Sequence, residues 1–199
     1  MSDAFFDVVR SQRACRSFAD EPVPDELVEG VLEAATFAPS AENRQPWVFV
    51  VVRDDGMRAR IGALTRRAWD EGARAFSESR LEPALLADVD RGATGGVSAA
   101  PVLVIVAADL ERCLEATVAS SLFPAIQNLL LAATAAGLGS ALTTLVTAHA
   151  DELRALLDLP EHVRPVAVVP LGYPARPLRP PRREPVADHT YRERFGQHW

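Results

Sequence analysis

Apolar residues recur at helical spacing in several parts of the chain. The clearest case is residues 25–37, where Leu27 and Val31 fall on one face of a helix. Pro24 and the acidic residues that follow it are typical of a helix start. The same spacing predicts further helices at residues 3–12, at residues 149–157, and in the arginine-rich stretch that follows residues 54–56.

Three runs of uninterrupted apolar residues predict strands. They cover residues 47–52, 101–106 and 165–172. A strand that is apolar on both faces belongs to a sheet that is covered on both sides. Residues 140–144 predict a short further strand that runs into a loop. Together with the helices, these strands indicate an α+β fold.

The longest apolar segment, residues 117–136, approaches the length of a membrane span. It carries Pro124, Gln127 and Asn128, which a lipid-facing span would have to satisfy internally. We therefore expect a buried core helix and no membrane contact. Gly137, just beyond the last turn, is a typical left-handed helix stop.

Residues 38–47 form the most distinctive loop of the chain. Two prolines, of which Pro39 is the first, stiffen it because proline fixes its own φ and restricts the residue before it. Between the prolines, Ser40, Asn43 and Gln45 offer a hydroxyl group and two amides. Such groups suit a flat ligand with polar edges better than they suit acid–base catalysis.

Two regions lack a clear hydrophobic pattern. In residues 66–98, glycines and a proline interrupt weak helical stretches, and we expect a mobile lid over a pocket there. Residues 174–199 are rich in proline and arginine and end in aromatic side chains, so they cannot pack as regular structure by themselves. We expect this C-terminal arm to lie across another surface, such as a partner subunit.

The composition is that of an ordinary soluble globular protein. With 199 residues the chain can bury a core, and we expect one domain over residues 1–199. The net charge is −6, so no basic surface for nucleic acid is indicated. The N-terminal residues show no signal peptide, and Cys15 and Cys113 lack the spacing of a metal site or disulfide framework. We therefore expect a cytoplasmic protein with reduced thiols.

Candidate catalytic side chains are scarce in this sequence. The 4 histidines are scattered without metal-ligand spacing, so we expect them at the surface and expect no metal site. The Gly-x-Ser-x-Gly motif of serine nucleophiles does not occur, and Ser40 has no nearby base in the sequence. Binding groups without an obvious acid, base or nucleophile are typical of proteins in which a cofactor carries the difficult step.

Paired arginines are the strongest charged feature of the chain. Arg13 and Arg16 follow the first predicted helix, and Arg182 and Arg183 lie in the C-terminal arm. Converging guanidinium groups can hold a phosphate through bidentate, charge-assisted hydrogen bonds. The alternative is that they are solvated surface charges, and spacing alone favours that alternative.

Taken together, these motifs resemble the nitroreductase family of FMN flavoproteins. The loop at residues 38–47 is the most specific part of the resemblance, and only residues 66–98 lack a clear counterpart. The other matching stretches, in the order of the family, are residues 13–18, Pro22-Val23-Pro24, Gln127-Asn128, Gly137-Leu138-Gly139, residues 171–174 and Arg182-Arg183.

The resemblance implies a nitroreductase-like three-layer α+β fold, with a mixed, mostly antiparallel central sheet and helices on both faces. It also implies a homodimer that exchanges its extended C-terminal arms and binds FMN at the subunit interface. The implied activity is that of an NAD(P)H-dependent oxidoreductase. NADH or NADPH would reduce the flavin, and an electron-poor small-molecule acceptor, such as a nitroaromatic or a quinone, would then be reduced in a ping-pong cycle.

The resemblance also assigns binding roles by motif match, with the flavin and no side chain carrying the chemistry. Arg13 and Arg16, helped by the backbone at Ala14, would hold the FMN phosphate. The remaining implied contacts are Pro39, Ser40, Asn43 and Gln45 of the other subunit around the isoalloxazine ring, the backbone at Leu142, Thr143 and Thr144 facing that ring, and Arg183 with Arg182 returning to the phosphate.

The chain departs from the family pattern near the implied phosphate site. Gln12 and Ala14 stand where the family often has an arginine and a serine, and a lysine often found near the flavin has no counterpart. An arginine of residues 58–67 is the candidate replacement for that lysine. Two alternatives stay open: a specialised flavin reaction such as dehalogenation or flavin degradation, and a non-catalytic flavin carrier or sensor.

Overall fold

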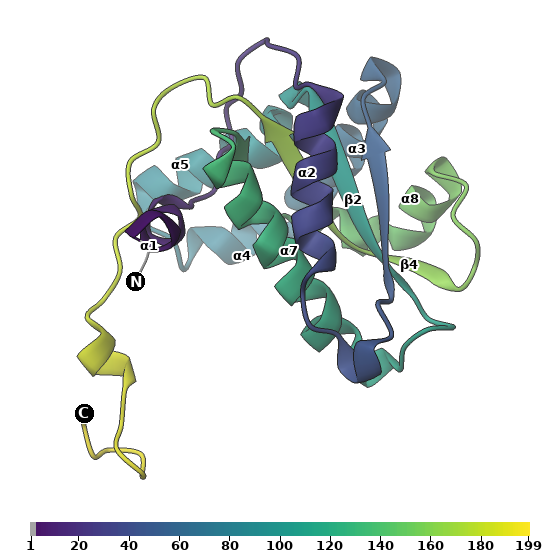
Figure 1. Ribbon diagram of the computed structural model, residues 1–199. Helices are drawn as coiled ribbons and strands as arrows, with labels where there is room; N and C mark the ends of the chain where they lie inside the picture. The colour runs from purple at the N-terminus through teal and green to yellow at the C-terminus, as the bar shows by residue number, and fades with distance from the viewer. Residues whose placement is uncertain (1–2) are drawn as a thin grey trace.

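The computed structural model describes residues 3–199, in which a β-sheet lies between two layers of helices (Figure 1). The strands follow the order β1-β2-β4-β3, and neighbouring strands are antiparallel. A parallel bridge between Ala14 and Ser140 attaches the segment after the first helix to the edge of this sheet. The strands are β1 (Trp47–Val52), β2 (Val102–Asp109), β3 (Gly139–Ser140) and β4 (Val163–Gly172).

The helices occupy most of the predicted positions. The α-helices are α1 (Asp3–Ser11), α2 (Asp25–Thr36), α3 (Asp55–Ala68), α4 (Arg74–Glu78), α5 (Pro83–Arg91), α6 (Val97–Ala99), α7 (Val118–Ala135) and α8 (Ala150–Leu156). The shorter helical turns are η1 (Ala41–Asn43), η2 (Trp69–Ala73), η3 (Gly92–Gly96), η4 (Glu115–Thr117), η5 (Leu145–His149) and η6 (Val186–His189).

Side chains of β2 alternate between the two faces of the sheet, and each face has its own core. Val104 and Val106 pack in the core formed with α2 and α7. Leu103 and Ile105 point to the other face, where they pack with Ile61 of α3. These side chains are fully buried. The predicted three-layer α+β fold with helices on both faces is confirmed.

The central helix α7 is a core helix, as predicted. The segment Glu115–Ala135 is long and apolar enough to cross a membrane by length and composition alone. However, Leu122, Ile126 and Leu129 on this helix are buried against α2 and the sheet. Gly137 ends the helix with φ of +75°, in the left-handed conformation that glycine adopts without a steric penalty.

The first strand differs from its prediction because β1 is an edge strand. It pairs with β2 on one side only, since the strand order places it at the end of the sheet. Most of its side chains are half-buried, and Val51 is 38% exposed. The apolar run at residues 47–52 therefore predicted a strand correctly but overestimated its burial within one chain.

Residues 66–98 are more regular than the sequence pattern predicted. Here α3 leads through η2, α4, α5 and η3 into α6, with a turn at residues 79–82. Trp69 is 1% exposed, and its indole N–H donates to Asp90 Oδ1 at 2.9 Å, which ties η2 to α5. The glycine-containing stretches η2 and η3 are π-helical turns. Gly72, with φ of +152°, places a kink in η2, whereas η3 continues without a break into α6.

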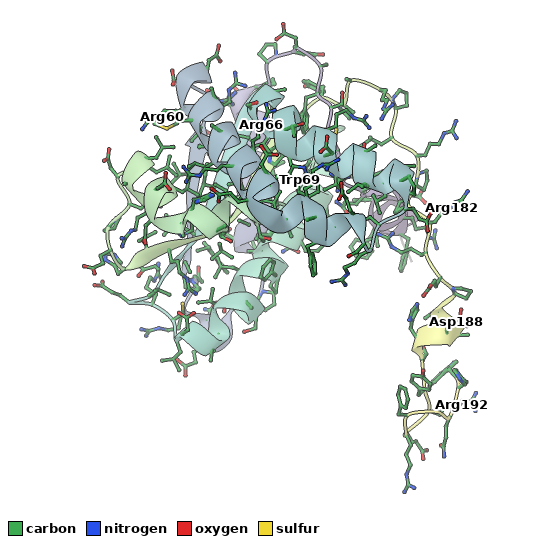
Figure 2. All side chains as sticks on the ribbon, turned by 180° about the vertical axis from the view of Figure 1, so that it is seen from behind. Arg60, Arg66, Trp69, Arg182, Asp188 and Arg192 are labelled. Atoms are coloured by element: carbon green, nitrogen blue, oxygen red, sulfur yellow. The ribbon has the colours of Figure 1, made fainter. Side chains whose placement is uncertain are left out.

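After β4 the chain leaves the body of the protein as an extended arm, which the two opposite views both show (Figures 1 and 2). The short helix η6 is the regular element of this arm, and Phe195 and Trp199 near its end are 89% and 73% exposed. The extended arm is present as predicted, whereas its exchange with a partner remains a proposal that is taken up below.

Candidate functional site

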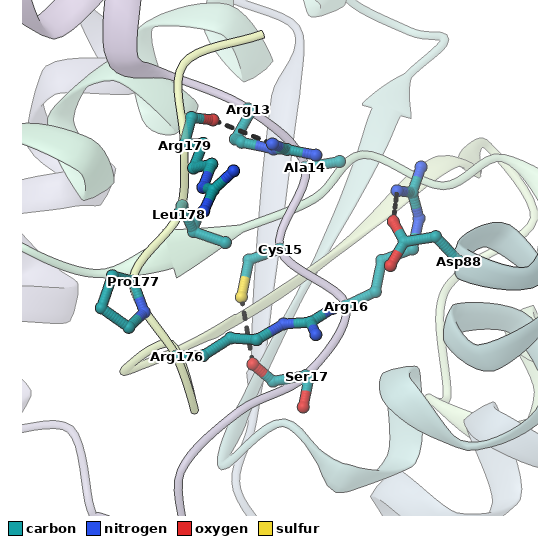
Figure 3. A pocket seen from close by; sticks show the side chains of 10 residues that line it. All are labelled: Arg13, Ala14, Cys15, Arg16, Ser17, Asp88, Arg176, Pro177, Leu178 and Arg179. Atoms are coloured by element: carbon teal, nitrogen blue, oxygen red, sulfur yellow. Dashed lines mark hydrogen bonds and ion pairs between the residues drawn. The ribbon is translucent and has the colours of Figure 1, made fainter. Parts of the chain in front are cut away.

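Two cavities meet at Cys15 and Arg16. The larger has a volume of about 380 Å³ and lies between residues 13–17, Asp88 and the beginning of the C-terminal arm (Figure 3). The smaller has a volume of about 240 Å³ and extends from Arg16 past η3 to residues 141–145. Pockets of a few hundred Å³ are of the size that small molecules and cofactors occupy.

The larger cavity is strongly basic. Its lining includes the side chains of Arg13, Arg16, Arg176 and Arg179, against the single carboxylate of Asp88 among the described lining residues. Guanidinium groups stay charged at all physiological pH values and form fork-shaped hydrogen bonds with phosphate oxygens. This cavity is therefore suited to an anionic group.

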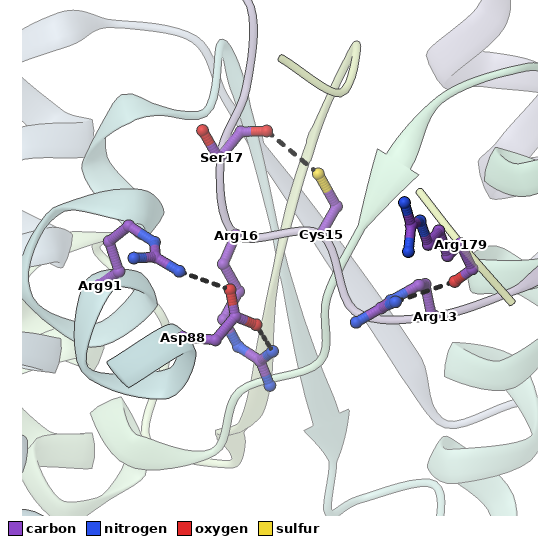
Figure 4. A network of polar contacts seen from close by, with 7 residues as sticks. All are labelled: Arg13, Cys15, Arg16, Ser17, Asp88, Arg91 and Arg179. Atoms are coloured by element: carbon purple, nitrogen blue, oxygen red, sulfur yellow. Dashed lines mark hydrogen bonds and ion pairs between the residues drawn. The ribbon is translucent and has the colours of Figure 1, made fainter. Parts of the chain in front are cut away.

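Arg13 and Arg16 line the same cavity but leave the chain in different directions (Figure 4). Arg13 Nη1 donates to the backbone carbonyl of Arg179 in the arm at 2.9 Å. Arg16 Nη1 is 2.6 Å from Asp88 Oδ2 on α5, and both side chains are only 23% exposed. Each predicted arginine is therefore brought to the cavity, one by the arm and one by α5.

Asp88 binds two arginines at once. Its Oδ1 accepts a hydrogen bond from Arg91 Nη2 at 3.0 Å while its Oδ2 pairs with Arg16. Burial acts to raise the pKa of Asp88, but the hydrogen bonds from Arg91 and Arg16 and their charges outweigh it, so the pKa lies below its ordinary value of 3.8. Asp88 is thus an ionised partner of Arg16 at neutral pH.

The smaller cavity brings the predicted backbone segment to the same place. Leu142, Thr143 and Thr144 line it together with Cys15 and Arg16. Thr143 is fixed on β4, because its amide donates to the Val168 carbonyl at 3.0 Å and its carbonyl accepts from the Val168 amide at 2.9 Å. A backbone donor directed at a ligand must therefore come from a neighbour of Thr143.

Cys15 has a structural position between the two cavities. Its amide donates to the Ser140 carbonyl at 2.8 Å, beside the bridge between Ala14 and Ser140, and its thiol donates to the Ser17 carbonyl at 3.2 Å. Burial raises the pKa of the Cys15 thiol, so it stays protonated at neutral pH. A buried neutral thiol is a packing group, which agrees with the prediction of reduced, buried cysteines.

The loop at residues 38–47 lies away from both cavities. Ser40 Oγ accepts from the Gln45 amide at 3.0 Å, and the Ala41 amide donates to Ser121 Oγ in the first turn of α7 at 3.1 Å. Cys15, in contrast, is bonded to Ser140, which follows the other end of α7. At 1.5 Å per residue, the part of α7 beyond Ser121 spans about 20 Å. One chain therefore cannot bring this loop to its own arginine cavity.

The same loop holds an uncommon backbone conformation. Glu42, Asn43 and Gln45 have φ of 54°, 53° and 49°, although none of them is glycine. Left-handed conformations cost roughly 1 kcal/mol or more per ordinary residue, and they concentrate at binding sites where the surrounding structure holds them. The exposed amides of Asn43 and Gln45 are thus presented by a loop that is already shaped.

Arg182 and Arg183, which the resemblance assigns to the FMN phosphate, lie elsewhere in the single chain, and that role stays a prediction. Arg182 and Arg183 do not line either cavity; Arg183 Nη1 instead donates to the Arg182 carbonyl at 2.9 Å. Arg176 and Arg179 line the basic cavity in their place because they directly follow β4, before the arm moves away. Sequence reasoning missed them, although both stand beside prolines in a stretch that already looked unusual.

The arginines of α3, one of which is the candidate replacement for the family's lysine, also lie away from the two cavities of the single chain. Arg58 Nη1 donates to the carbonyls of Ser98 and Ala100 at 2.9 and 2.6 Å. Arg67 pairs with Glu152 of α8. None of the described α3 arginines lines the two cavities, and Arg16 is the arginine that reaches the smaller one.

Two findings concern the histidines. The His149 side chain is 13% exposed, with Nε2 3.3 Å from Glu71 Oε2, so it is not the free surface residue that was expected. Asp109, Glu111 and His162 come within 4.8 Å of one another, a grouping that sequence spacing did not suggest. All three lie at or near the surface, where such groups are common without a metal ion.

Comparison with known proteins is consistent with this site. A provisionally named NADH dehydrogenase/NAD(P)H nitroreductase of Methanothermobacter thermautotrophicus is 34% identical over 178 residues, which are 85% of this chain and 76% of that protein. Iodotyrosine deiodinase 1 of Rattus norvegicus is 30% identical over 186 residues, 88% of this chain, and the chain spans only 64% of that enzyme.

A solved structure and a family description agree with these two relatives. A provisionally described nitroreductase of Desulfovibrio desulfuricans, solved in complex with FMN, matches with a TM-score of 0.76 and 30% identity, covering 96% of this chain and 97% of the other. The description of the Nitroreductase family matches residues 9–173, which include residues 13–17 and Asp88 of the arginine cavity and the loop at 38–47, whereas Arg176 and Arg179 lie beyond the match. The chain belongs to the nitroreductase family.

Proposed function

We propose that the protein is an FMN-dependent oxidoreductase that transfers electrons from NADH or NADPH to a small electron-poor acceptor. The observation that carries this proposal is the pair of cavities that meet at Arg16. One cavity is rich in arginines, and beyond Arg16 the other is lined mostly by apolar and small residues. An amphipathic ligand with a phosphate at one end and a flat ring at the other requires such an arrangement. FMN has this form, so the residues present fit it.

Within this proposal the side chains bind and orient the cofactor. Arg13, Arg16, Arg176 and Arg179 supply charge for the phosphate, and residues 142–144 bound the space for the ring. When bound, FMN supplies reversible hydride and electron transfer, so the protein needs no acid, base or nucleophile of its own. The protonated thiol of Cys15 agrees with such a passive role.

The site that we propose is completed by a second copy of the chain. The loop at residues 38–47 carries shaped, exposed amides but lies about 20 Å along α7 from the segment that contains Arg13 and Arg16. In a homodimer the loop of one chain can reach the flavin of the other. Pro39, Ser40, Asn43 and Gln45 would then act on the partner's cofactor.

An exposed apolar surface supports the dimer. Phe5 and Phe37 are 60% and 79% exposed, and they border one groove between α1, the end of α2 and the outer side of α7. We name this surface the α1–α7 patch. Its described lining residues are Ala4, Phe5, Val8, Ala34, Phe37, Asn128, Leu131, Ala132 and Ala135. Contiguous apolar surface of this kind marks interfaces.

The proposed acceptor is a nitroaromatic, a quinone or a similar electron-poor compound. The provisional nitroreductase name of the archaeal relative supports this class. We place the protein in the cytoplasm, where a nicotinamide donor is available and where the thiols of Cys15 and Cys113 stay reduced.

A specialised flavin reaction is the second candidate. The similarity to iodotyrosine deiodinase 1 of Rattus norvegicus favours reductive dehalogenation as the specific form of that alternative. Under this alternative, a halogenated aromatic compound would take the place of the nitroaromatic acceptor.

The first experiment is an absorbance spectrum of the purified, full-length protein, repeated without oxygen after addition of NADH or NADPH. We expect a flavin spectrum, with or without added FMN, that bleaches with at least one nicotinamide and recovers with a nitroaromatic or a quinone. A protein that binds no FMN contradicts the proposal.

The other outcomes separate the alternatives. Reoxidation of the reduced flavin by an iodinated or brominated phenol, but not by nitroaromatics, favours dehalogenation. A carrier or sensor is favoured if neither NADH nor NADPH reduces the bound flavin, and if flavin reduced with dithionite is not reoxidised by any added acceptor.

A further inference from the structure

Arg16 is enclosed by one continuous segment, residues 88–96, which covers the end of α5 and all of η3. Asp88 holds its guanidinium group at 2.6 Å, and Arg91 holds Asp88 from the other side at 3.0 Å (Figure 4). The carboxylate therefore has both oxygens engaged, which restricts its own movement. Arg16 is thereby fixed by a partner that is itself fixed.

Two glycines let this segment approach Arg16 closely. A Cβ atom at Gly92 would lie 2.6 Å from Arg16 Cδ, and a Cβ atom at Gly96 would lie 2.5 Å from the Arg16 carbonyl oxygen. Both separations are too short for any side chain, so η3 contacts the stem and the backbone of Arg16 only because these residues are glycines. Gly95, between them, meets nothing within 4 Å.

We propose that Asp88, Gly92 and Gly96 position Arg16 for flavin binding, with Asp88 fixing its guanidinium group and the two glycines allowing η3 to fix its stem and backbone. This inference rests on the proposed function, because it assumes that FMN is the ligand of the two cavities. Asp88 and the glycines are positioning residues, since they act through Arg16.

The physical reason is preorganisation. A free arginine side chain loses rotamer freedom when it binds a ligand, whereas an arginine that is already held loses less and binds more tightly. Asp88 uses one Nη atom of a group with five N–H donors, so it can hold Arg16 while other donors remain for the ligand. The π-helical turn η3 serves to bring the backbone of the 66–98 region against Arg16.

An alternative role for Asp88 predicts the opposite change in FMN affinity. If Asp88 only neutralised Arg16 in the absence of ligand, the phosphate of FMN would have to displace it. Removing the carboxylate would then tighten FMN binding instead of weakening it. Measurement of FMN affinity therefore distinguishes a positioning residue from a competitor.

The test is a fluorescence titration of full-length apoprotein with FMN, using wild type, Asp88→Asn, Gly92→Ala and Gly95→Ala. We expect the Kd to rise about tenfold for Asp88→Asn, since hydrogen bonds between charged groups are worth this order of affinity. We expect a rise of the same order for Gly92→Ala, because its Cβ would lie 2.6 Å from Arg16 Cδ and displace the side chain. Gly95→Ala is the matched control and should stay within twofold of wild type. Thermal unfolding of each apoprotein identifies a variant that is not folded.

A double-mutant cycle separates positioning from general structural support. Arg16→Gln and Arg16→Gln/Asp88→Asn are titrated alongside the single variants, and we expect Asp88→Asn to have no further effect once Arg16 is absent. The inference is overturned if Asp88→Asn leaves the FMN Kd unchanged or lowers it. It is also overturned if Asp88→Asn changes the Kd by the same factor in wild type and in Arg16→Gln. A wild-type protein that binds no FMN contradicts the proposed function instead.

Discussion

Replacing Phe37 with serine is expected to dissociate the proposed homodimer. Phe37 directly follows α2 and is 79% exposed on the α1–α7 patch, immediately before the loop at residues 38–47. The substitution removes one large apolar contact and adds a small polar group at the same position. Because the side chain has few contacts within its own chain, the folded monomer should lose little stability.

The magnitude follows from the area of the ring. A buried phenylalanine removes roughly 200 Å² from water, and at about 25 cal/mol per Å² the exposed part of Phe37 corresponds to about 4 kcal/mol. A two-fold symmetric interface covers two such rings, but incomplete burial of each ring and the entropy lost on ordering it offset part of the gross gain. We therefore expect a net loss of about 4 kcal/mol, or about a thousandfold in the dimer Kd.

Analytical ultracentrifugation over a series of protein concentrations measures this change. Wild type should sediment as a dimer at micromolar concentration, and Phe37→Ser should sediment mainly as a monomer. The control is Val51→Thr, which makes an exposed apolar residue of β1 polar at nearly constant volume, on a different surface. A monomeric wild type, or a Phe37→Ser variant that associates as tightly as wild type, refutes the reasoning.

Three further predictions concern stability and binding. Gly139→Ala should lower the free energy of unfolding in urea by about 1–3 kcal/mol, because its Cβ would lie 2.6 Å from Cys15 Sγ. Arg176→Ala should raise the FMN Kd about tenfold by removing a charged hydrogen-bond donor from the basic cavity, whereas Arg192→Ala in the distal arm should leave it unchanged. The pKa of Asp88 is lowered in the folded state, so its ionised carboxylate contributes fully to the free energy of unfolding above the ordinary pKa of 3.8. This contribution is lost as the pH falls further. The difference in free energy of unfolding between wild type and Asp88→Asn should therefore shrink below pH 3.8.

Each of these predictions has a contradicting result. Gly30→Ala is the control for Gly139→Ala, since its Cβ meets nothing within 4 Å in the middle of α2 and should be neutral or slightly stabilising. Equal effects of the two substitutions would contradict the packing argument. An Arg176→Ala protein with wild-type affinity would exclude this residue from the phosphate site. A stability difference that does not depend on pH would contradict the ionised state of Asp88.

The layers of the fold could be predicted because burial leaves a local signature in the sequence. The apolar run of β2 and the apolar helix α7 are both buried where the pattern indicated. Residues 66–98 could not be predicted in the same way, because two of their glycines, Gly92 and Gly96, serve close contacts with a residue far away in the sequence. Gly92 faces Arg16, and no local pattern reveals a contact over that distance.

The candidate site was predictable only where the sequence contains a compact motif. Arg13, Arg16 and residues 142–144, which the resemblance singles out, line the two cavities, and their contacts with FMN stay a prediction. Arg176 was missed because its position depends on the path of the arm after β4, and Asp88 because an isolated aspartate on a helix normally indicates a solvated surface. The partner of such a charge becomes visible only when the chain is folded.

The position of β1 at the end of the sheet has a consequence for handling the protein. Its outer edge carries unpaired backbone N–H and C=O groups beside a valine-rich, uncharged sequence, which is the composition of strands that add to other strands. Subunits that lose their partner would at the same time expose the apolar α1–α7 patch. Dilution or an interface substitution should therefore lead to irreversible aggregation as well as to dissociation, and light scattering at low protein concentration is needed to recognise the difference.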